Sequence, residues 1–267
     1  MTRLRIVKLM IVALSFVFVP LLFAQENNQA ALDKKVRAFL DSQAREWHDA
    51  NVPETDGKLL YDIIIKNKYT KALEIGTSTG HSAIWIAWAL SKTGGKLITV
   101  EIDESRHKKA LENFKKAGLS EYVDARLADA HELVPKLDGP FDFVFSDAET
   151  EWYKNYFDAV APKLDVGGCY TTHDVSDSYV SYIENLIKAL ARGLIKGHMS
   201  DHIHNVSEAD SYATYLKSLK NFETTFNDNV LVLPSATRNP KSRWLWKTPL
   251  ASSWKESSVS FLQRISL

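Results

Sequence analysis

The sequence predicts one doubly wound α/β domain with a mostly parallel, seven-stranded sheet, helices on both faces and an antiparallel strand at the C-terminal end. Two observations support this prediction. Short apolar runs alternate with amphipathic helical runs between residues 71 and 174, as in chains of parallel βαβ units. A glycine-rich turn, GTSTG at 76–80, follows the first of these strands and precedes a helix, which is typical of the ligand-binding edge of such a sheet.

The first 24 residues differ in composition from the rest of the chain. Arg3, Arg5 and Lys8 precede an apolar run over 9–24, and this order is typical of a secretory signal. It predicts an exported protein, periplasmic or secreted, with an uncleaved membrane anchor as the alternative. We therefore expect a signal or anchor over 1–24, the folded domain over 27–250 and a C-terminal tail over 251–267.

Two helical segments come before the first strand of the alternating region. Apolar residues recur at helical spacing over 31–48, and 59–65 reads as a second helix, with a loop predicted over 51–57 between them. The strands predicted next are KALEIG, KLITVEI, VDARLAD and FDFVFSD, and the helices between them cover 82–90, 104–117 and 130–137.

The rest of the domain begins with a helix over 153–164 and a buried strand, GGCYTTHD. Helical patterns follow over 179–194 and 207–222, and the runs VLVLP and SRWLWKT suit an antiparallel pair at one edge of the sheet. The single cysteine, Cys169, excludes an intramolecular disulfide framework and a multi-cysteine metal site.

The charge composition gives no support to a nucleic-acid partner. The 33 Lys and Arg residues balance the 33 Asp and Glu residues, and the body of the chain has no long basic run. We expect a small-molecule partner instead, with membrane contact only through an uncleaved N-terminal segment. The sequence leaves a homodimer open.

Polar residues stand at the ends of successive predicted strands. Glu101 ends the second, where its carboxylate could accept hydrogen bonds from both hydroxyls of a ribose, and Asp129 follows the third, where it could accept from an adenine amino group. The loop lacks the GxGxxG and GxxxxGK[ST] patterns, which argues against a pyrophosphate. Each residue also has a structural interpretation: Gly76 and Gly80 as turn formers, Glu101 and Asp129 as helix caps.

The series EIGTSTG, VEID, LADA and FVFSDAE resembles, in order and spacing, the class I S-adenosylmethionine-dependent methyltransferases. The resemblance is greatest to the metal-dependent O-methyltransferases of the catechol and caffeoyl-CoA type, whose layout Asn51-Val52 and GGCYTTHD also match. It covers about residues 36–248 and implies transfer of a methyl group to a hydroxyl of a small, aromatic acceptor. It also implies that these residues bind S-adenosylmethionine: Val52, Glu74, Gly76 and Ser82 around the methionine part, Glu101 at the ribose, Asp129 and Ala130 at the adenine, and Asp147.

Asp147 and Asp174 end adjacent predicted strands, so their carboxylates could hold a divalent cation, Mg²⁺ or Mn²⁺, that acidifies the acceptor hydroxyl. The resembling family ends the second of these strands in Asp-Asn, whereas this chain has His173-Asp174. A histidine ligand favours a transition metal such as Mn²⁺, Fe²⁺ or Zn²⁺ over Mg²⁺. The predicted metal ligands are therefore Asp147, His173 and Asp174.

The catalytic base has more than one candidate. His173 could be the general base of a metal-independent methyltransferase, or simply a core histidine. The related enzymes usually carry a lysine where this chain has Thr150, and Lys154, one helical turn further on, is the expected substitute. These departures leave a non-catalytic S-adenosylmethionine-binding protein as another alternative. His81, beside the glycine loop, could also contact cofactor or substrate.

Overall fold

The computed structural model describes residues 26–47, 51–173, 215, 218, 219, 225–227 and 230–234. All of them belong to one compact unit, Met1–Ala236, and the second unit, Thr237–Leu267, lies outside the described residues. Several predicted features also lie outside them: the signal or anchor over 1–24, Asp174, the helix over 179–194, most of the helix over 207–222, the strand SRWLWKT and the tail over 251–267.

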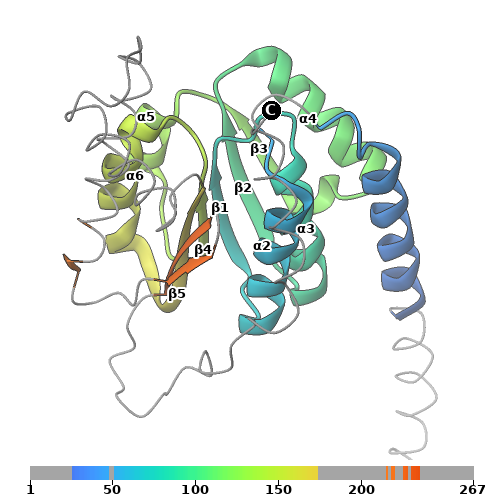
Figure 1. The fold of residues 1–267 in the computed structure, drawn as a ribbon, viewed down its shortest axis with the longest axis horizontal. Helices are drawn as coiled ribbons and strands as arrows, with labels where there is room; N and C mark the ends of the chain where they lie inside the picture. Colours follow the sequence, from blue (N-terminus) through green and yellow to red (C-terminus); the bar gives the residue numbers. More distant parts are fainter. Residues whose placement is uncertain are drawn as a thin grey trace, which may run out of the picture. The chain divides into compact units, whose positions relative to one another are not determined.

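The described strands form one sheet in the order β3-β2-β1-β4-β5-β7-β6 (Figure 1). Strands β1 to β5 pair in parallel, whereas β7 runs antiparallel to β5 and β6 antiparallel to β7. The predicted parallel α/β sheet is confirmed, while the short β6 was not predicted. The strands are β1 (Lys71–Ile75), β2 (Lys96–Glu101), β3 (Val123–Leu127), β4 (Phe141–Ser146), β5 (Leu164–His173), β6 (Thr225–Asn227) and β7 (Val230–Pro234).

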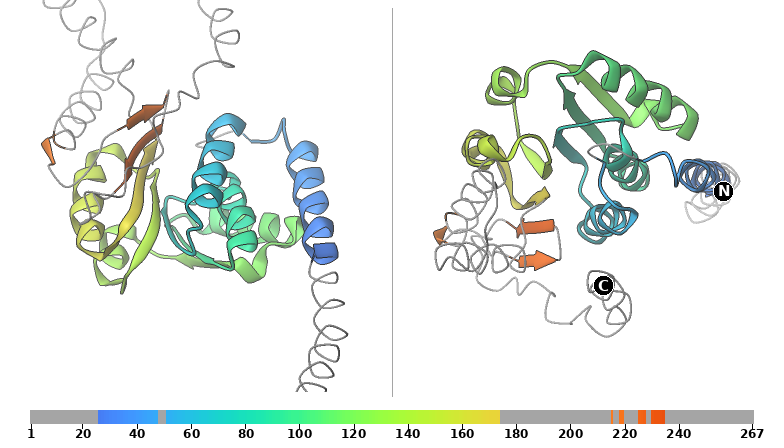
Figure 2. Two further views of the ribbon diagram at one scale, coloured as in Figure 1. Left: turned by 90° about the horizontal axis from the view of Figure 1, so that it is seen from below. Right: turned by 45° about the horizontal axis from the view of Figure 1, so that its top comes forward.

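Helices cover both faces of the sheet, as predicted: α2, α3 and α4 lie on one face and α5 and α6 on the other (Figure 2). A helix over 26–42 precedes them. The α-helices are α2 (Glu54–Asn67), α3 (His81–Thr93), α4 (Glu104–Ala117), α5 (Ala130–Leu133) and α6 (Tyr153–Val160). Short 3₁₀ turns cover Ser120–Tyr122, Val134–Lys136, Thr150–Trp152 and Ala161–Lys163.

Three predicted boundaries are wrong for local physical reasons. The loop expected over 51–57 is shorter because α2 already begins at Glu54, where Pro53 precedes the first turn and the acidic Glu54 and Asp56 suit the positive end of the helix. The helix expected over 130–137 tightens into a 3₁₀ turn at Val134–Lys136, which contains a proline. The helix expected over 153–164 ends at Val160, before another proline-containing turn.

The core lies on both sides of β1, β4 and β5. On one side, Tyr153, Phe157 and Val160 of α6 pack against Val144 and Tyr170 of the sheet. On the other side α3 is buried over most of its surface, because it lies between the sheet and α2. No helix in the described part of the chain has the length and apolar character needed to cross a membrane.

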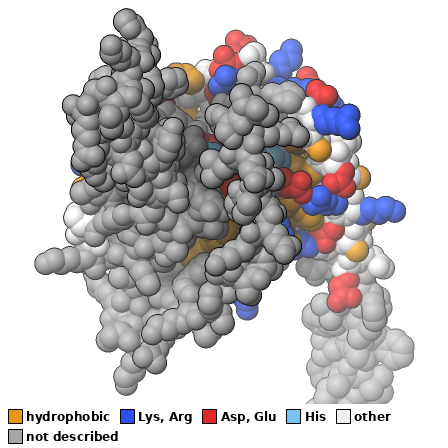
Figure 3. Space-filling view, in the orientation of Figure 1, with side chains coloured by type: hydrophobic (Ala, Val, Ile, Leu, Met, Phe, Trp, Pro, Cys, Tyr) orange, Lys and Arg blue, Asp and Glu red, His pale blue; other side chains and the backbone are white. Residues whose placement is uncertain are grey.

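On the face in Figure 3, basic and acidic side chains are interspersed over the coloured surface. No large patch of one sign is visible there. This agrees with the balanced charge of the sequence.

Candidate functional site

The register of the parallel strands brings the polar strand ends together. Ile75 in β1 is the partner of Val100 in β2 and of Ser146 in β4, and Ser146 is the partner of Thr172 in β5. The residues that follow therefore emerge at one edge of the sheet, where parallel α/β sheets bind ligands. They are Gly76, Glu101, Asp147 and His173.

The glycine-rich loop between β1 and α3 has a backbone that requires glycine at its first position. Gly76 has φ +95°, and a Cβ there would lie 2.4 Å from the carbonyl oxygen of Asp147. The backbone N–H of Gly76 donates to the Val100 carbonyl at 3.1 Å, so the loop is tied to β2. Ser78 also has a positive φ, of 49°. The loop is thus held close to the strand ends on both sides.

Glu101 supports this loop directly. Its carboxylate accepts hydrogen bonds from the backbone N–H groups of Ser78 at 2.7 Å, Ile102 at 3.0 Å and Asp103 at 2.9 Å. A carboxylate offers about four acceptor positions, so at least one remains for a ligand hydroxyl. Ile102, next to it, exposes 69% of its surface, although large apolar side chains are usually buried. The motif VEID contained this residue, but its exposure could not be read from the sequence.

Glu74, one residue before the end of the central strand β1, is fully buried. Its Oε2 accepts a hydrogen bond from the Thr99 hydroxyl, and its Oε1 has no hydrogen-bond partner among the described residues. Burial raises the pKa of Glu74 to about 8, with a smaller contribution from the carboxylates of Asp147 and Glu101 and against the lowering effect of hydrogen bonds from Ser82 and Thr99. A cationic group arriving at this edge would reverse that effect, because it stabilises the charged carboxylate.

His173 lies between two carboxylates from different elements. Its Nε2 is 3.0 Å from Oδ2 of Asp56, in the first turn of α2, and its Nδ1 is 3.4 Å from Oδ1 of Asp147. The side chains of Asp56 and His173 are each only 10% exposed. The sequence analysis singled out His173 and Asp147 but missed Asp56, because no local pattern links residues 117 positions apart.

A second cluster joins the ends of β3 and β4. Asp129 caps α5 by accepting from the His131 backbone N–H at 2.8 Å, so its structural interpretation is confirmed. The His131 ring stacks on Trp152 at 3.7 Å and contacts Glu149, which also accepts from the Tyr156 hydroxyl at 2.7 Å. The carboxyl of Asp129 stays partly exposed, so the cap does not block a ligand contact. Neither Glu149 nor His131 was predicted as part of the site.

The remaining predicted cofactor residues lie around the loop. Val52 is buried, Ser82 is buried in the first turn of α3, and Ala130 begins α5 beside Asp129. Whether they bind a cofactor stays a prediction.

His81 is held as a core residue rather than presented to a ligand. Its Nδ1 lies 2.8 Å from the Val52 carbonyl, and its Nε2 accepts from the Trp85 indole at 3.2 Å. The Trp47 ring stacks on it at 4.5 Å. Because Nε2 accepts from Trp85, the proton must be on Nδ1, and burial lowers the pKa of His81. His81 therefore fastens the segment before α2 to α3.

Lys154 points to a neighbour on its own helix. Its Nζ donates to Oδ2 of Asp158 at 2.6 Å and lies 4.5 Å from the centre of the Tyr215 ring. About half of the side chain is exposed. The catalytic role expected for Lys154 stays a prediction, and the geometry of this pair does not support it.

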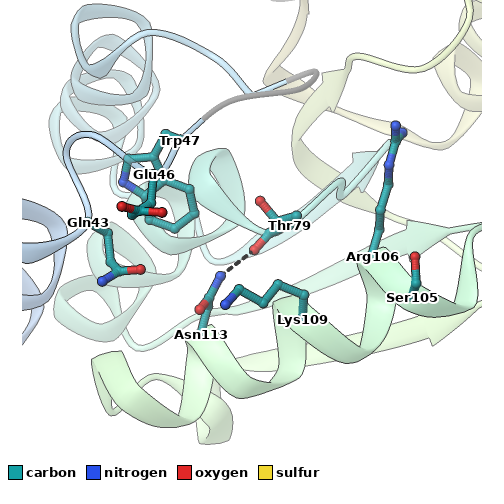
Figure 4. Close-up of a pocket in the computed structure, with 8 residues that line it drawn as sticks. All are labelled: Gln43, Glu46, Trp47, Thr79, Ser105, Arg106, Lys109 and Asn113. Atoms are coloured by element: carbon teal, nitrogen blue, oxygen red, sulfur yellow. Dashed lines mark hydrogen bonds between the residues drawn. The ribbon is translucent and has the colours of Figure 1, made fainter.

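A cavity of about 400 Å³ lies beside the glycine loop, between α4 and the end of the helix over 26–42 (Figure 4). Thr79 belongs to both the loop and the cavity wall, where its carbonyl accepts from the Asn113 amide at 2.9 Å. The sequence analysis did not predict this cavity. Its lining side chains are Gln43, Glu46, Trp47, Thr79, Ser105, Arg106, Lys109 and Asn113.

The predicted metal ligands are described only in part. No group of three or more His, Cys, Asp or Glu side chains suited to a metal occurs among the described residues. Asp147 and His173 supply two facing donor atoms, and Asp174 lies outside the described residues. A separation of 3.4 Å between Oδ1 and Nδ1 suits two ligands that share one ion, since each bond to a metal such as Zn²⁺ is about 2.0–2.2 Å long.

A family described as a methyltransferase domain matches residues 73–175. The chain is 38% identical over 111 residues to a catechol O-methyltransferase of Niastella koreensis, covering 40% of this chain and 50% of that protein. It is 33% identical over 115 residues to a catechol O-methyltransferase of Mycobacterium tuberculosis, covering 43% and 52%. The chain thus spans about half the length of the curated relatives it matches.

One solved structure shows the same fold. It is an O-methyltransferase from Bacillus cereus in complex with SAH, with a TM-score of 0.60 at 22% identity, over 76% of this chain and 91% of that chain. The matched family segment contains the four strand ends described above, from Gly76 to His173.

Proposed function

We propose that this chain is an S-adenosylmethionine-dependent O-methyltransferase of the class I family, because a methyltransferase-domain family matches residues 73–175 and the relatives it matches include catechol O-methyltransferases. Its acceptor is a hydroxyl of a small, aromatic molecule, as the names of its catechol O-methyltransferase relatives suggest. The enzyme transfers the methyl group of the sulfonium to that oxygen.

One observation supports the cofactor above the others: the loop after β1 is joined to the carboxylate that ends β2. The Ser78 backbone N–H donates to Glu101, so the loop and the ribose-binding carboxylate are held as one surface. On this surface Glu101 binds the ribose, Asp129 and Ala130 meet the adenine, and Ile102 covers an apolar face of the purine. Val52, Glu74, Gly76, Ser82 and Asp147 surround the methionine part.

The buried acid Glu74 suits the charge of this cofactor. S-adenosylmethionine brings a sulfonium and an ammonium group, and Glu74 has an unpartnered oxygen among the described residues and a pKa raised to about 8. A positive ligand favours the charged carboxylate, so binding and ionisation of Glu74 are linked.

Methyl transfer requires the acceptor oxygen in line with the methyl group and without its proton. His173 stands beside Asp147 at the edge where the methyl group would be held. Of the two candidate bases we choose His173, since Lys154 is paired with Asp158. His173 takes the acceptor proton, while the fixed loop and the ends of the strands hold the two reactants in place.

A divalent ion is the finer part of this proposal. Asp147 and His173 would hold it, with Asp174 as the third ligand, and the mixed nitrogen and oxygen donors favour Mn²⁺, Fe²⁺ or Zn²⁺ over Mg²⁺. With the ion bound, the Nδ1 lone pair of His173 would bind the metal, so His173 is the base only in the metal-independent form of the reaction. When bound, the ion supplies Lewis acidity that lowers the pKa of the acceptor hydroxyl.

We also retain two proposals for parts of the chain outside the described residues. Residues 1–24 direct export or anchor the protein, and the domain extends to about residue 250. The predicted pairing of VLVLP with SRWLWKT is wrong, because VLVLP forms β7 and already pairs with β5 on one side and β6 on the other. An exported enzyme would need an external supply of S-adenosylmethionine, so the anchor alternative stays open.

Calorimetric titration of S-adenosylmethionine into the full-length protein tests the function, with and without Mn²⁺. We expect micromolar binding that is lost in a Glu101→Ala, Asp129→Ala double variant and kept in Glu104→Ala, an exposed acid in the first turn of α4. No binding with any ion would contradict the proposal.

The same preparation separates the alternative functions when a panel of catechol-like acceptors is added. Turnover that needs Mn²⁺ supports the metal-assisted enzyme, and equal turnover without it supports His173 as a metal-independent base. Binding of S-adenosylmethionine without methylation of any acceptor would favour the non-catalytic alternative.

A further inference from the structure

Asp56 is a buried acid. It is far from the ends of the strands in the sequence, but in the folded chain it contacts His173 at the end of β5. It is 7% exposed and occupies the third position of α2. The positive end of that helix stabilises a carboxylate there. A buried carboxylate still requires hydrogen-bond donors, and Asp56 has two: the Thr55 hydroxyl at 3.2 Å on Oδ1 and His173 at 3.0 Å on Oδ2.

The two contacts of the His173 ring are not equivalent. The distance from Nε2 to Asp56 lies within the usual range for an N–H···O bond, about 2.7–3.2 Å, whereas the 3.4 Å from Nδ1 to Asp147 lies beyond it. A neutral imidazole carries one N–H. In the neutral ring the shorter contact places that proton on Nε2, and Nδ1 is then the nitrogen without a proton, on the side of Asp147.

The orientation of the ring is fixed by its other neighbour as well. Phe145 in β4 contacts the His173 ring edge to face, with ring centres 6.4 Å apart and planes at 73°. Tilting the ring plane would lose this contact, and a half-turn that keeps the plane would still lose the bond to Asp56. The Nδ1 atom is thus the one that reaches the ligand-binding edge.

From this arrangement we propose that Asp56 is the positioning residue of the site: by accepting the Nε2 proton of His173, it makes Nδ1 the nitrogen that meets the acceptor proton or a metal ion beside Asp147. The proposal deepens the proposed methyltransferase function and rests on it for the role of Nδ1. In metal sites, a carboxylate that receives the second N–H of a ligating histidine sets its tautomer in the same way.

The tautomer can be measured without cofactor, metal or turnover. Long-range ¹H–¹⁵N correlation spectra of the full-length protein, labelled at histidine nitrogen, report which ring nitrogen is protonated. The His173 signals are assigned by their disappearance in His173→Gln, since the chain has 8 histidines. We expect a proton on Nε2 of His173. A proton on Nδ1, alone or together with one on Nε2, would overturn the proposal.

Substitution of Asp56 supplies the second readout. In Asp56→Ala we expect a mixture of His173 tautomers and a Zn²⁺ affinity, measured by calorimetry, about ten- to 100-fold weaker than in the wild type. The matched control is Asp62→Ala: Asp62 lies on the same helix, is about half exposed and pairs with Lys58. It should change neither property. If Asp56→Ala keeps the wild-type tautomer and the wild-type affinity, Asp56 has no positioning role.

Two further measurements separate positioning from simple stabilisation. Where Asp56→Ala does not fold, Asp56→Leu replaces it, because leucine has nearly the same shape and no acceptor for the Nε2 proton; an unchanged tautomer and unchanged Zn²⁺ affinity in that variant would also overturn the proposal. In turnover assays, Asp56→Leu should lower kcat at least tenfold with KM for S-adenosylmethionine unchanged. A wild type that binds no S-adenosylmethionine contradicts the proposed function, while the spectra still decide the pairing of Asp56 with His173.

Discussion

The backbones of Gly76 and Asp147 are in close contact at the carboxyl ends of β1 and β4: a Cβ on Gly76 would come within 2.4 Å of the Asp147 carbonyl oxygen. The loop that would hold the cofactor and the carboxylate that would hold the ion therefore share one backbone contact. A substitution that shifts the backbone at Gly76 must therefore also shift the backbone at Asp147, because the contact is with a carbonyl oxygen and not with a flexible side chain.

Gly76→Ala should accordingly abolish binding of S-adenosylmethionine and destabilise the protein by about 3 kcal/mol or more, since it combines a backbone clash with an unfavourable φ. Gly94→Ala is the matched control: its φ is also positive, +77°, but nothing lies within 4 Å of the added Cβ. It should cost only about 1–2 kcal/mol and leave binding intact. Calorimetry and urea unfolding measure both effects. Equal losses in the two variants would mean that backbone conformation alone, not the contact with Asp147, accounts for Gly76.

Glu74→Gln should stabilise the protein by an amount that depends on pH. Burial raises the folded pKa of Glu74 from 4.5 to about 8, so the wild type loses stability as pH rises from the first value to the second. The slope is at most about 1.4 kcal/mol per pH unit. The advantage of the glutamine should thus be absent at pH 4, grow up to about pH 8 and then stay constant. Urea unfolding at several pH values checks this, with the exposed Glu104→Gln as control. A difference that does not vary with pH would contradict the buried, protonated state of Glu74.

The two aspartate caps provide a test of the adenine contact. Asp103 and Asp129 each accept a backbone N–H at 2.8 Å at the start of a helix, from Arg106 and His131. Either aspartate changed to alanine should lower the stability of the protein, because a backbone N–H at the start of a helix loses its acceptor. Only Asp129→Ala should also weaken binding of S-adenosylmethionine, by about tenfold, because its free oxygen lies where the adenine amino group is expected. If calorimetry gives the two variants equal affinities for S-adenosylmethionine, Asp129 acts only as a helix cap.

His173→Gln and Lys154→Gln distinguish the two candidate bases. Loss of a general base lowers the rate by about 10²–10⁴-fold, and we expect a fall of that size for His173→Gln. Lys154 sits in an exposed ion pair with Asp158, which is worth about 1 kcal/mol at most, so its substitution should change kcat less than twofold. Initial rates at saturating S-adenosylmethionine measure both. A larger fall in kcat for Lys154→Gln than for His173→Gln would identify Lys154 as the base.

Much of the fold could be predicted because its signals are local. Alternating apolar and amphipathic runs predicted the parallel strands, and the glycines at 76–80 predicted a tight turn before a helix, where the structure has a positive φ at Gly76. Because the strands are parallel and in register, their polar ends were expected at one edge, and the structure places Glu101, Asp147 and His173 there.

Boundaries and pairings that depend on tertiary packing could not be predicted in this way. The start of α2 at Glu54 replaced an expected loop, and this puts Asp56 on a helix that packs against α3. The contact of His131 with Glu149 joins segments that follow two different strands. Neither feature has a signature in the spacing of the residues involved.

The sequence by itself thus determined the succession of strands and helices along the chain, the glycine loop and the acids at the strand ends. Each follows from short-range periodicity or from the conformational freedom of glycine. Only the tertiary structure decided which partner each acid and histidine has. In the folded chain Asp56 is buried against His173, 117 positions away. The His81 ring is hydrogen-bonded to the Val52 carbonyl in the core, and Lys154 donates to Asp158. The reason is physical: a buried polar group must find a donor or acceptor among whatever side chains the packing of the whole domain brings within about 3 Å.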